Sequence, residues 1–417
     1  MAKKGDMLYA WTNDADIKKH AELGGAVTAL WKHALDSKVV DAVLVVKKGT
    51  DLYDAQPALI TKSEDLKDTA GSLHCGTLLL AKLIHKFLDG AEHMKLGVTV
   101  KGCDMMGMYE LAKRKQINLD NVIMIGVNCG GSVSPVTARK MIADKFGVDP
   151  DKVHKEEIDK GQFIIEYEGG HKGISVDELE EQGYGRRTNC RRCKLKIPRQ
   201  ADLACGNWGV IGDKAGKATF IEVCSEKGAN LVSGAIKAGL LATEAANPKG
   251  LEIRAKVENA MMKLGDKWRQ KDFAGLGEGK DRLKKIMAET SRCIKCYSCI
   301  SACPICYCVD CTTKNPAYVT PGQLPPNFMF HLIRFAHIAD SCVNCGQCQE
   351  LCPAEIPNAL FMHAQQVELE KMFGHTPGIS MELPLLALVE EKEERARLAN
   401  TGSDMIYENV FNPVAKK

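Results

Sequence analysis

Short apolar runs and segments of helical periodicity alternate over the first 250 residues. Four runs rich in β-branched residues predict buried strands, at residues 42–46, 95–100, 121–127 and 219–223. Apolar residues at helical spacing predict helices, at residues 77–88, 135–146 and 228–242. Ser134 is the expected N-cap of the second helix. Strands separated by helices of this length favour an α/β layer architecture.

A different pattern begins near residue 251. Residues 251–289 are helical and charged, and a glycine-rich patch at 275–279 interrupts them. Further helices are predicted at residues 328–339 and 358–373, and the charged run 390–397 predicts a solvent-exposed helix face. We therefore expect an α/β domain at residues 1–250, a helical linker at 251–290, a mostly helical domain at 291–375 and a tail at 376–417.

The composition is that of a globular protein. The chain has 417 residues, 45% of them hydrophobic and 26% charged, which fits two or three domains of about 150 residues each. The 56 basic and 53 acidic residues give a net charge of +3, which argues against a nucleic-acid or membrane-surface binder. Since no apolar run approaches the ~18 residues of a membrane span and no signal sequence is evident, we expect a cytoplasmic protein.

Cysteine is the exception in this composition. The chain has 18 cysteines, and 11 of them lie between Cys293 and Cys352. A disulfide scaffold would be short and secreted. In a cytoplasmic protein, metal binding is the expected use of thiols at such density.

One cysteine motif occurs twice. Cys293, Cys296, Cys299 and Cys303 are spaced by two, two and three residues before Pro304, and Cys342, Cys345, Cys348 and Cys352 repeat this spacing before Pro353. This is the ferredoxin pattern for two 4Fe-4S clusters, in which the fourth cysteine of each motif binds the other cluster. One cluster then has the ligands Cys293, Cys296, Cys299 and Cys352, and the other has Cys342, Cys345, Cys348 and Cys303. A zinc module is the alternative, but zinc sites use cysteine pairs and not triplets at this spacing.

Three more cysteines, Cys306, Cys308 and Cys311, lie between the two motifs. The 39-residue separation from Cys303 to Cys342, with a helix inside it, resembles the helical ferredoxin domains of respiratory and methanogenic reductases. The additional thiols either contribute to a further cluster or are packing thiols, and the spacing leaves both readings open.

Four cysteines of the first 250 residues form a second candidate site. Cys103 and Cys129 each follow a predicted strand, and the carboxyl ends of parallel strands are where ligands gather in α/β sheets. Cys190 and Cys193 form a CxxC pair among arginines and lysines, whose charges stabilise thiolates. These four either bind a third cluster or are buried free thiols, and no role is evident for Cys75, Cys205 or Cys224.

Two glycine-containing segments precede apolar helical patterns. Gly24, Gly25 and Thr28 open the first, and Gly71 and Ser72 open the second. Helix N-termini of this composition suit phosphate groups, but an ordinary helix start explains each equally well. Neither segment fits the GxGxxG fingerprint, and the chain has no Walker A sequence.

Taken together, these segments resemble one family over residues 1–250. The segments 24–30 and 70–72, the stretch Lys101 to Asp104, the run 129–131 and the CxxC pair with 201–203 are similar to the beta subunits of coenzyme F420 hydrogenases and dehydrogenases. The appended two-cluster domain is similar to the formate dehydrogenase branch of that family. The resemblance implies FAD, coenzyme F420 and a third 4Fe-4S cluster bound by Cys103, Cys129, Cys190 and Cys193. It also implies these cofactor-binding residues: Gly24, Gly25, Thr28, Gly71, Ser72, Lys101, Gly130, Gly131 and Arg186.

The resemblance further implies a function. FAD would exchange hydride with coenzyme F420 and single electrons with the clusters, while a partner alpha subunit with a molybdenum or tungsten pterin oxidises formate. A heterodisulfide reductase complex is a further candidate partner, and no catalytic acid–base residue is expected in this chain. Three alternatives stay open: a family member with another partner (a hydrogenase, sulfite reductase or glutamate synthase), an electron-transfer subunit without flavin, and a zinc-stabilised interaction protein.

Overall fold

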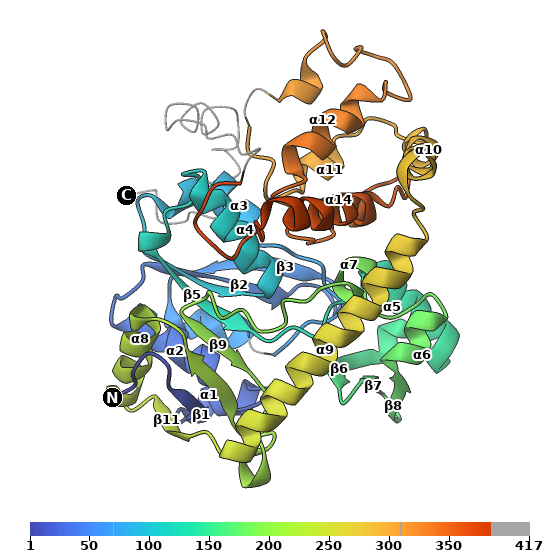
Figure 1. Cartoon of the computed structure of the whole chain (residues 1–417). Helices are drawn as coiled ribbons and strands as arrows, with labels where there is room; N and C mark the ends of the chain where they lie inside the picture. Colours follow the sequence, from blue (N-terminus) through green and yellow to red (C-terminus); the bar gives the residue numbers. More distant parts are fainter. Residues whose placement is uncertain (70, 309–310, 385–417) are drawn as a thin grey trace. The chain divides into compact units, whose positions relative to one another are not determined.

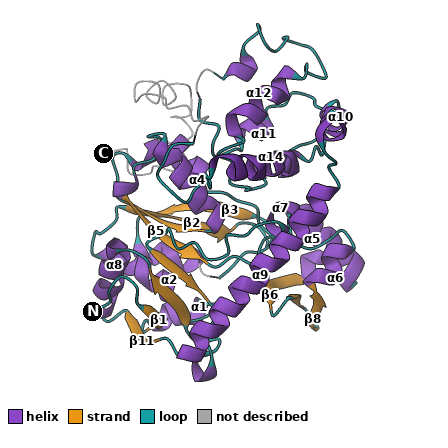
Figure 2. Cartoon of the chain, in the orientation of Figure 1, coloured by secondary structure: helices purple, strands orange, loops and turns teal. Residues whose placement is uncertain are grey.

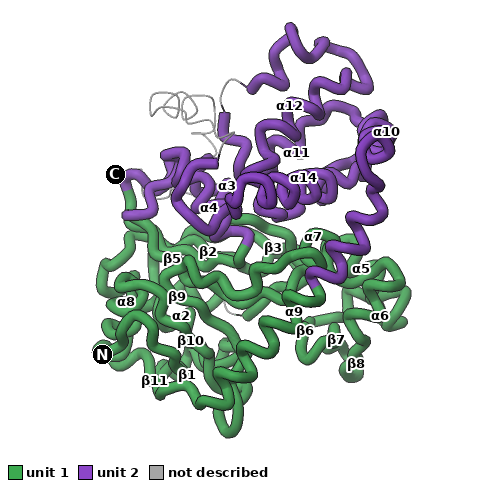
Figure 3. Tube along the Cα trace, in the orientation of Figure 1, with its two compact units in different colours: residues 1–80, 94–102, 121–264 green, residues 81–93, 103–120, 265–417 purple. Residues whose placement is uncertain are grey.

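The chain folds into two compact units. The computed structural model describes residues 1–384 except 70, 309 and 310, so the charged run 390–397 and most of the tail 376–417 lie outside the described residues (Figure 1). Residues 1–80, 94–102 and 121–264 form one unit, here called the sheet unit (Figure 3). Residues 81–93, 103–120 and 265–417 form the other, here called the cysteine unit. Among the described residues, no helix is both long and apolar enough to cross a membrane.

The sheet unit is built on a sheet of eight strands, and a smaller three-stranded sheet accompanies it (Figure 2). The order in the large sheet is β11-β1-β10-β9-β5-β4-β2-β3. Its strands are β1 (Met7–Thr12), β2 (Ala42–Lys48), β3 (Ala55–Ile60), β4 (Leu96–Val100), β5 (Val122–Val127), β9 (Leu203–Gly206), β10 (Thr219–Val223) and β11 (Leu241–Ala245).

The middle of this sheet is parallel. Strands β2, β4, β5 and β9 run in one direction, with Leu96 paired to Val122 and Ile125 paired to Leu203. Strand β3 pairs antiparallel to β2, and β10, β1 and β11 continue the other edge antiparallel. Because β4 and β5 are parallel neighbours, the residues that follow them, Lys101 and Cys129, leave the sheet at the same edge.

Helices α2 (Ala26–Asp36) and α8 (Glu226–Lys237) pack against each other and bury the main apolar core with residues of the strands. Trp31 of α2 is fully buried, and its Nε1 donates to Thr99 Oγ1 over 2.8 Å. Gly97 makes room for the indole, since a Cβ there would lie 2.6 Å from the Trp31 ring. Helix α1 (Ala15–His20) precedes α2.

The three-stranded sheet has its own core. Strands β6 (Val153–Asp159), β7 (Gln162–Tyr167) and β8 (Gly170–Ser175) form an antiparallel meander. Helix α5 (Pro135–Met141) continues as a π-helical turn to Phe146, whose ring meets the buried Phe163 edge-on. Two short helices complete this part of the sheet unit, α6 (Val176–Glu181) and α7 (Thr188–Arg191).

The cysteine unit is helical. Its helices are α3 (Ala81–Phe87), α4 (Gly102–Lys113, from Cys103 on), α10 (Gly279–Thr290), α11 (Ser298–Ser301), α12 (Met329–Ile338), α13 (Gln347–Glu350) and α14 (Asn358–Phe373). The long helix α9 (Pro248–Ala274) begins in the sheet unit and ends in the cysteine unit. Short 3-10 helices occur at Ser63–Thr69, Asp89–Ala91, Leu119–Asn121, Pro150–Lys152, Gly212–Lys214 and Thr312–Lys314.

Helix α4 is tied to the cysteine motifs inside the cysteine unit. Gly107 packs against Pro304, which follows the first motif. A Cβ on Gly107 would lie 3.4 Å from the Cβ of Pro304. The buried Arg114 donates from Nη2 to Ser341 Oγ over 2.6 Å, immediately before Cys342. Helix α4 thus contacts both motifs, although about 180 residues or more separate it from them in the sequence.

Most of the predicted elements are confirmed. The predicted strands correspond to β2, β4, β5 and β10, and the helices at 328–339 and 358–373 correspond to α12 and α14. The side chain of Ser134 caps α5 by accepting from Thr137 N, as predicted. The helix at 77–88 is wrong at its start, because residues 71–80 are coil and α3 begins at Ala81. That coil segment is held by contacts of its own, described below.

Candidate functional site

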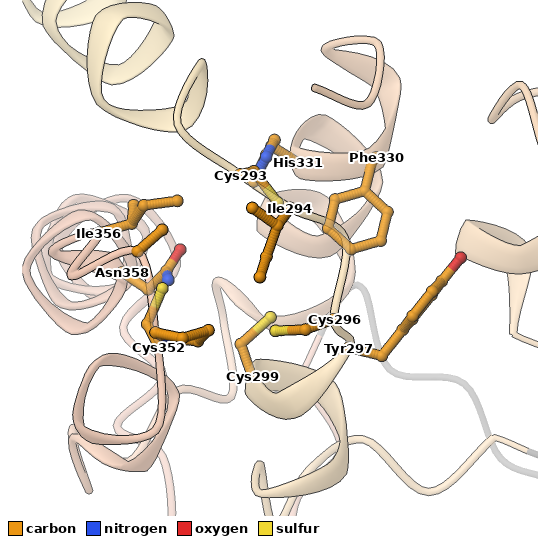
Figure 4. A pocket seen from close by; sticks show the side chains of 12 residues that line it. Cys293, Ile294, Cys296, Tyr297, Cys299, Phe330, His331, Cys352, Ile356 and Asn358 are labelled. Carbon is orange, nitrogen blue, oxygen red and sulfur yellow. The ribbon is translucent and has the colours of Figure 1, made fainter. Parts of the chain in front are cut away.

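Four cysteines from the two motifs surround one pocket of the cysteine unit (Figure 4). They are Cys293, Cys296, Cys299 and Cys352, and their side chains point toward one another. The pocket has about 340 Å³ of empty space, including the part open to solvent. Its other lining residues are Ile294, Tyr297, Phe330, His331, Pro353, Ala354, Ile356 and Asn358. The structure therefore brings together the four cysteines of the first crossed set.

The backbone of the two motifs has the same unusual conformation. In the first motif Lys295 and Tyr297 have positive φ values of 52° and 61°, and in the second Asn344 and Gly346 have 50° and 77°. These residues follow the first cysteine of each motif by two and by four positions. The left-handed residues fold each triplet into a tight loop, in which the Lys295 N–H donates to Cys293 Sγ over 3.3 Å.

The second crossed set also gathers, and it is more deeply buried. Cys303 and Cys345 are buried, while Cys342 and Cys348 are half-buried. Burial and the charges of Cys303, Cys348 and Cys342 raise the pKa of Cys345 well above its ordinary value. Four thiolates at this spacing repel one another strongly unless positive charge lies between them. Sulfur donors in this arrangement suit a thiolate-bound iron cluster.

Two of the three additional cysteines, Cys306 and Cys311, lie near different crossed sets. Cys306 hydrogen-bonds to Cys303, which lowers the pKa of Cys303 and raises that of Cys306. Cys311 lies elsewhere, 3.0 Å from Thr313 Oγ1 and near Tyr297 of the first set. Among residues 1–384, with 70, 309 and 310 excepted, no three His, Cys, Asp or Glu side chains meet where a single metal ion could be held.

Three of the four N-terminal candidates lie together in the sheet unit. Cys129 follows β5, and its N–H donates to Lys196 O over 3.0 Å. Cys190 of α7 lies 3.8 Å from Ser132 Oγ, and Cys193 Sγ donates to Leu195 O over 3.5 Å. The charges of both Cys190 and Cys193 act on Cys129. These three thiols thus approach one another near the carboxyl end of β5.

Cations accompany these thiols. Lys196 is 2% exposed, and its Nζ donates to Cys190 O over 3.4 Å. Burial alone would raise the pKa of Cys190, but the charges of Arg187 and Lys196 and hydrogen bonding from Ser132 outweigh it and lower that pKa. Lys101, directly after β4, donates to Leu78 O over 2.9 Å and its charge also acts on Cys129. The site is therefore electropositive.

The fourth candidate, Cys103, begins the second segment of the cysteine unit, residues 103–120. Its chain neighbour Gly102 belongs to the sheet unit, where a Cβ on Gly102 would lie 2.9 Å from Leu195 O. Leu195 follows Cys193 by two positions. Chain connectivity thus joins Cys103 to the segment that carries the CxxC pair.

Gly131 and Arg186 have a packing role at this site. Arg186 is buried and donates from Nε to Glu180 Oε1 over 2.6 Å and from Nη1 to Gly130 O over 2.8 Å. Gly131 has φ +125°, and a Cβ there would lie 2.6 Å from Arg186 Cδ and 3.2 Å from Cys190 Cβ. Because Gly131 has no side chain, the Arg186 guanidinium and helix α7, which carries Cys190, can pack closely against its backbone.

The first glycine segment combines packing with a helix start. Gly24 is buried against the paired strands β1 and β10, since a Cβ there would lie 2.6 Å from Ala10 O and 2.9 Å from Thr219 N. Gly25, with φ +68°, is the N-cap of α2, and Thr28 is half-buried in its first turn. Close packing therefore accounts for Gly24, while Gly25 and Thr28 stand at a helix N-terminus.

The second segment is a clamped loop. Gly71 and Ser72 are exposed, and no atom lies within 4 Å of a Cβ on Gly71. Just after them, the buried Glu156 of β6 accepts from the backbone N–H of His74 over 2.6 Å and of Cys75 over 3.3 Å. Glu156 also binds His74 Nδ1 at 2.9 Å. Glu156 has no signal in the sequence, because its partners lie about 80 residues away in the chain.

We expect Glu156→Gln to loosen this loop. Burial lowers the pKa of His74, but hydrogen bonding and the charge of Glu156 outweigh it, so the pKa lies above its ordinary 6.5. The pair's contribution to stability is therefore full below about pH 6.5 and is lost as pH rises through the higher folded pKa. The variant should lose about 1–3 kcal/mol at pH 6 and less at pH 8.

Thermal unfolding at the two pH values measures this effect. Glu166→Gln is the matched control, because Glu166 forms an exposed pair with Lys155 at 2.9 Å. Equal losses at both pH values would show that His74 is not the group that titrates.

Of the three unassigned thiols of the sheet unit, two are core residues and the third, Cys224, is half-buried. Cys75 and Cys205 are fully buried in apolar clusters, and burial raises the pKa of Cys205 to about 12. Cys224 donates to Glu222 O over 3.5 Å, and burial raises its pKa to about 11. High pKa values favour the protonated thiol, which is a poor metal ligand.

A parallel-centred sheet with thiols at its carboxyl edge, together with two crossed cysteine sets, defines an α/β protein of the iron–sulfur class. Comparison with protein families specifies it further. Residues 7–85 and 93–249 match the N- and C-terminal models of the coenzyme F420 hydrogenase/dehydrogenase beta subunit, and residues 289–356 match a 4Fe-4S dicluster domain. The chain belongs to the coenzyme F420 hydrogenase/dehydrogenase beta-subunit family, which confirms the resemblance seen in the sequence.

Two relatives match nearly the whole chain. The F420-dependent formate dehydrogenase subunit beta of Methanocaldococcus jannaschii is 48% identical over 90% of this chain and 97% of its own length. The F420-dependent formate dehydrogenase 1 subunit beta of Methanococcus maripaludis is 51% identical over 91% of this chain and 97% of its own length. In fold, the chain is similar to one chain of the F420-reducing NiFe hydrogenase complex from Methanosarcina barkeri. The TM-score is 0.55 and the identity 21%, over 65% of this chain and 93% of that chain.

Proposed function

We propose that the protein is the beta subunit of an F420-dependent formate dehydrogenase. In this role it exchanges electrons with coenzyme F420, while an alpha subunit with a molybdenum or tungsten pterin oxidises formate. The observation that carries the proposal is the 48% and 51% identity to two beta subunits of that name, over 97% of the length of each. The density of reduced thiols supports a cytoplasmic location.

The proposed 4Fe-4S ligands fall into three groups. Cys293, Cys296, Cys299 and Cys352 hold one cluster, and Cys303, Cys342, Cys345 and Cys348 hold the second. Cys103, Cys129, Cys190 and Cys193 hold the third, with Lys196 and Lys101 offsetting its negative charge. Unpartnered polar atoms support a bound group in the cysteine unit: the buried Nε2 of His331, which lines the pocket of the first set, has no hydrogen-bond partner among the described residues.

The sheet unit and the rest of residues 1–250 are the proposed FAD- and F420-binding domain. When bound, the clusters supply single-electron transfer, and FAD supplies the interconversion between single electrons and the hydride that F420 carries. The residues that we propose for these cofactors are Gly25, Thr28, Gly71, Ser72, Lys101 and Gly130. We propose Gly24, Gly131 and Arg186 for the same cofactors, and these three residues also pack closely against their neighbours. Gly25 and Thr28 offer a helix N-terminus to phosphate, and Lys101 a cation to the anionic F420 tail.

Reconstituted protein tests the proposal. The chain is loaded anaerobically with iron, sulfide and FAD and then supplied with reduced F420 and a viologen dye. We expect the absorbance of oxidised F420 to return as the dye is reduced. No turnover by protein that holds flavin and all its clusters would contradict the proposal and favour a flavin-independent relay or another hydride carrier.

The partner is tested separately. Mixed with the alpha subunit, the protein should reduce F420 with formate. Turnover with the dye but none with formate would indicate a different partner, such as a hydrogenase, sulfite reductase or glutamate synthase. Co-purification from cells tests whether a heterodisulfide reductase complex is attached as well.

The third cluster site leads to a prediction for Gly131→Ala. The alanine would have to keep the φ of +125°, which strains its backbone, and its methyl group would overlap Arg186 and approach Cys190. We expect the variant to lose about four iron atoms per chain, the content of one cluster. Gly130→Ala is the control, because no atom lies within 4 Å of a Cβ at that neighbouring glycine. Iron analysis and EPR spectroscopy measure the outcome, and full iron content in both variants would contradict the ligand assignment of Cys190.

A further inference from the structure

Arg334 of α12 lies among cysteines of both crossed sets. The side chain is 3% exposed, and its Nη2 donates to Cys299 O over 3.0 Å. Its Nε has no hydrogen-bond partner among the described residues. The thiols whose charges act most strongly on it are Cys299 of the first set, Cys303 and Cys348 of the second, and Cys306.

The charge of Arg334 needs a partner. A buried guanidinium without a counter-charge costs several kcal/mol, so such groups are normally paired with carboxylates. Within the part of the chain that the structure describes, no carboxylate forms an ion pair with Arg334. The negative groups around it are thiols from both sets. Its charge is therefore balanced by those thiolates and by the anionic iron–sulfur cluster of which they would be part, and the unpartnered Nε–H is available to the same groups.

A second cation, the half-buried Lys82, lies near a thiol of the second set only. Lys82 of α3 donates from Nζ to Cys306 O, and the thiols that act on it are Cys306, Cys303 and Cys308. None of these belongs to the first set. Lys82 and Arg334 thus differ in which thiols they reach, although both lie in the cysteine unit, Lys82 half-buried and Arg334 buried.

We propose that Arg334 sets the reduction potentials of the two C-terminal clusters together, by placing one fixed positive charge near the cysteines of both. The inference rests on the proposed function, because it requires both crossed sets to hold 4Fe-4S clusters. A cluster gains one negative charge on reduction, so a nearby cation in a low-dielectric interior stabilises its reduced form. One cation near both clusters raises both potentials and therefore leaves the difference between them little changed.

The test is an EPR-monitored redox titration of the reconstituted protein, with iron and sulfide measured on each sample. Arg334→Gln should lower the potentials of both clusters, and Arg334→Lys, which keeps the charge, should restore most of the shift. Lys82→Met should lower the potential of one cluster only. Arg292→Gln is the control, since Arg292 is adjacent to Cys293 but is half exposed and paired with Glu289.

The outcomes separate the inference from the proposed function. Arg334→Gln with full iron and unchanged potentials would overturn the inference, and so would an equal shift in Arg334→Lys. If Arg334→Gln loses iron while Arg334→Lys keeps its iron and the wild-type potentials, the result supports the inference that both clusters need a positive charge at position 334. Loss of iron from both variants would reduce Arg334 to a structural role. Absence of the two C-terminal clusters from the unmodified protein would instead contradict the cluster assignment itself.

Discussion

Replacing Cys352 by alanine should remove the cluster bound by the first motif, although Cys352 belongs to the second. Cys352 lines the same pocket as Cys293, Cys296 and Cys299. Without a fourth thiolate we expect this cluster to be lost or to be held as an incomplete species, with up to about four iron atoms fewer per chain. Because the cluster is part of the proposed electron path, dye-linked F420 oxidation should fall at least tenfold. The companion variant Cys303→Ala should remove the other cluster.

EPR spectra of the two variants distinguish crossed from local ligation. Crossed ligation predicts that Cys352→Ala keeps the signal of the cluster with Cys342, Cys345 and Cys348. Local ligation predicts the opposite loss. Cys224→Ala is the control, since Cys224 donates to a backbone carbonyl in the sheet unit and should be removable without loss of iron.

Replacing Glu110 by alanine should unfold the cysteine unit more readily than any surface change. Glu110 is fully buried on α4 and binds Lys113 Nζ at 2.5 Å, Arg114 Nη1 at 2.7 Å and the Gly378 N–H at 2.6 Å. The variant would leave two buried cations without a counter-charge, at a cost of about 3–5 kcal/mol. Arg114 also holds Ser341 beside Cys342, so the second motif should loosen as well.

Urea unfolding of the cluster-loaded protein, followed by cluster absorbance, measures this loss. Glu368→Ala is the matched control, because Glu368 pairs with Lys371 at 3.2 Å on an exposed face of α14 and should contribute less than about 1 kcal/mol. A loss in Glu110→Ala no larger than in the control would show that the buried ion group does not support the unit.

Local signals in the sequence predicted much of this fold. The parallel strands β2, β4 and β5 are apolar runs bounded by polar residues, and the predicted bounds of β10 and of α14 agree with the structure. The glycine patch ends α9 and begins α10, as expected. Strands β1, β3, β9 and β11 and the meander β6–β8 were not predicted, since they are short or carry polar residues among the apolar ones.

In the candidate sites too, the sequence identified some residues, while the contacts of others are known only from the structure. The repeated motif names its cysteines from spacing alone, because a tight loop around a cluster requires neighbouring thiols. Cys129, Cys190 and Cys193 were found from strand ends and a CxxC pair. Arg186 is predicted to bind a cofactor, and only the structure shows that its guanidinium donates to Glu180 and Gly130.

The sequence by itself determined the α/β class, the two cysteine motifs and the family. Each of these depends on residues a few positions apart, whose spacing is read directly along the chain. Only the tertiary structure decided which buried charges meet: Glu156 with the loop at His74, Glu110 with Gly378, and Arg334 with cysteines of both sets. The physical reason is that an ion pair or hydrogen bond depends on distance in space and leaves no periodic pattern in the sequence. Its cost when unpaired is nevertheless large enough to decide how the chain packs.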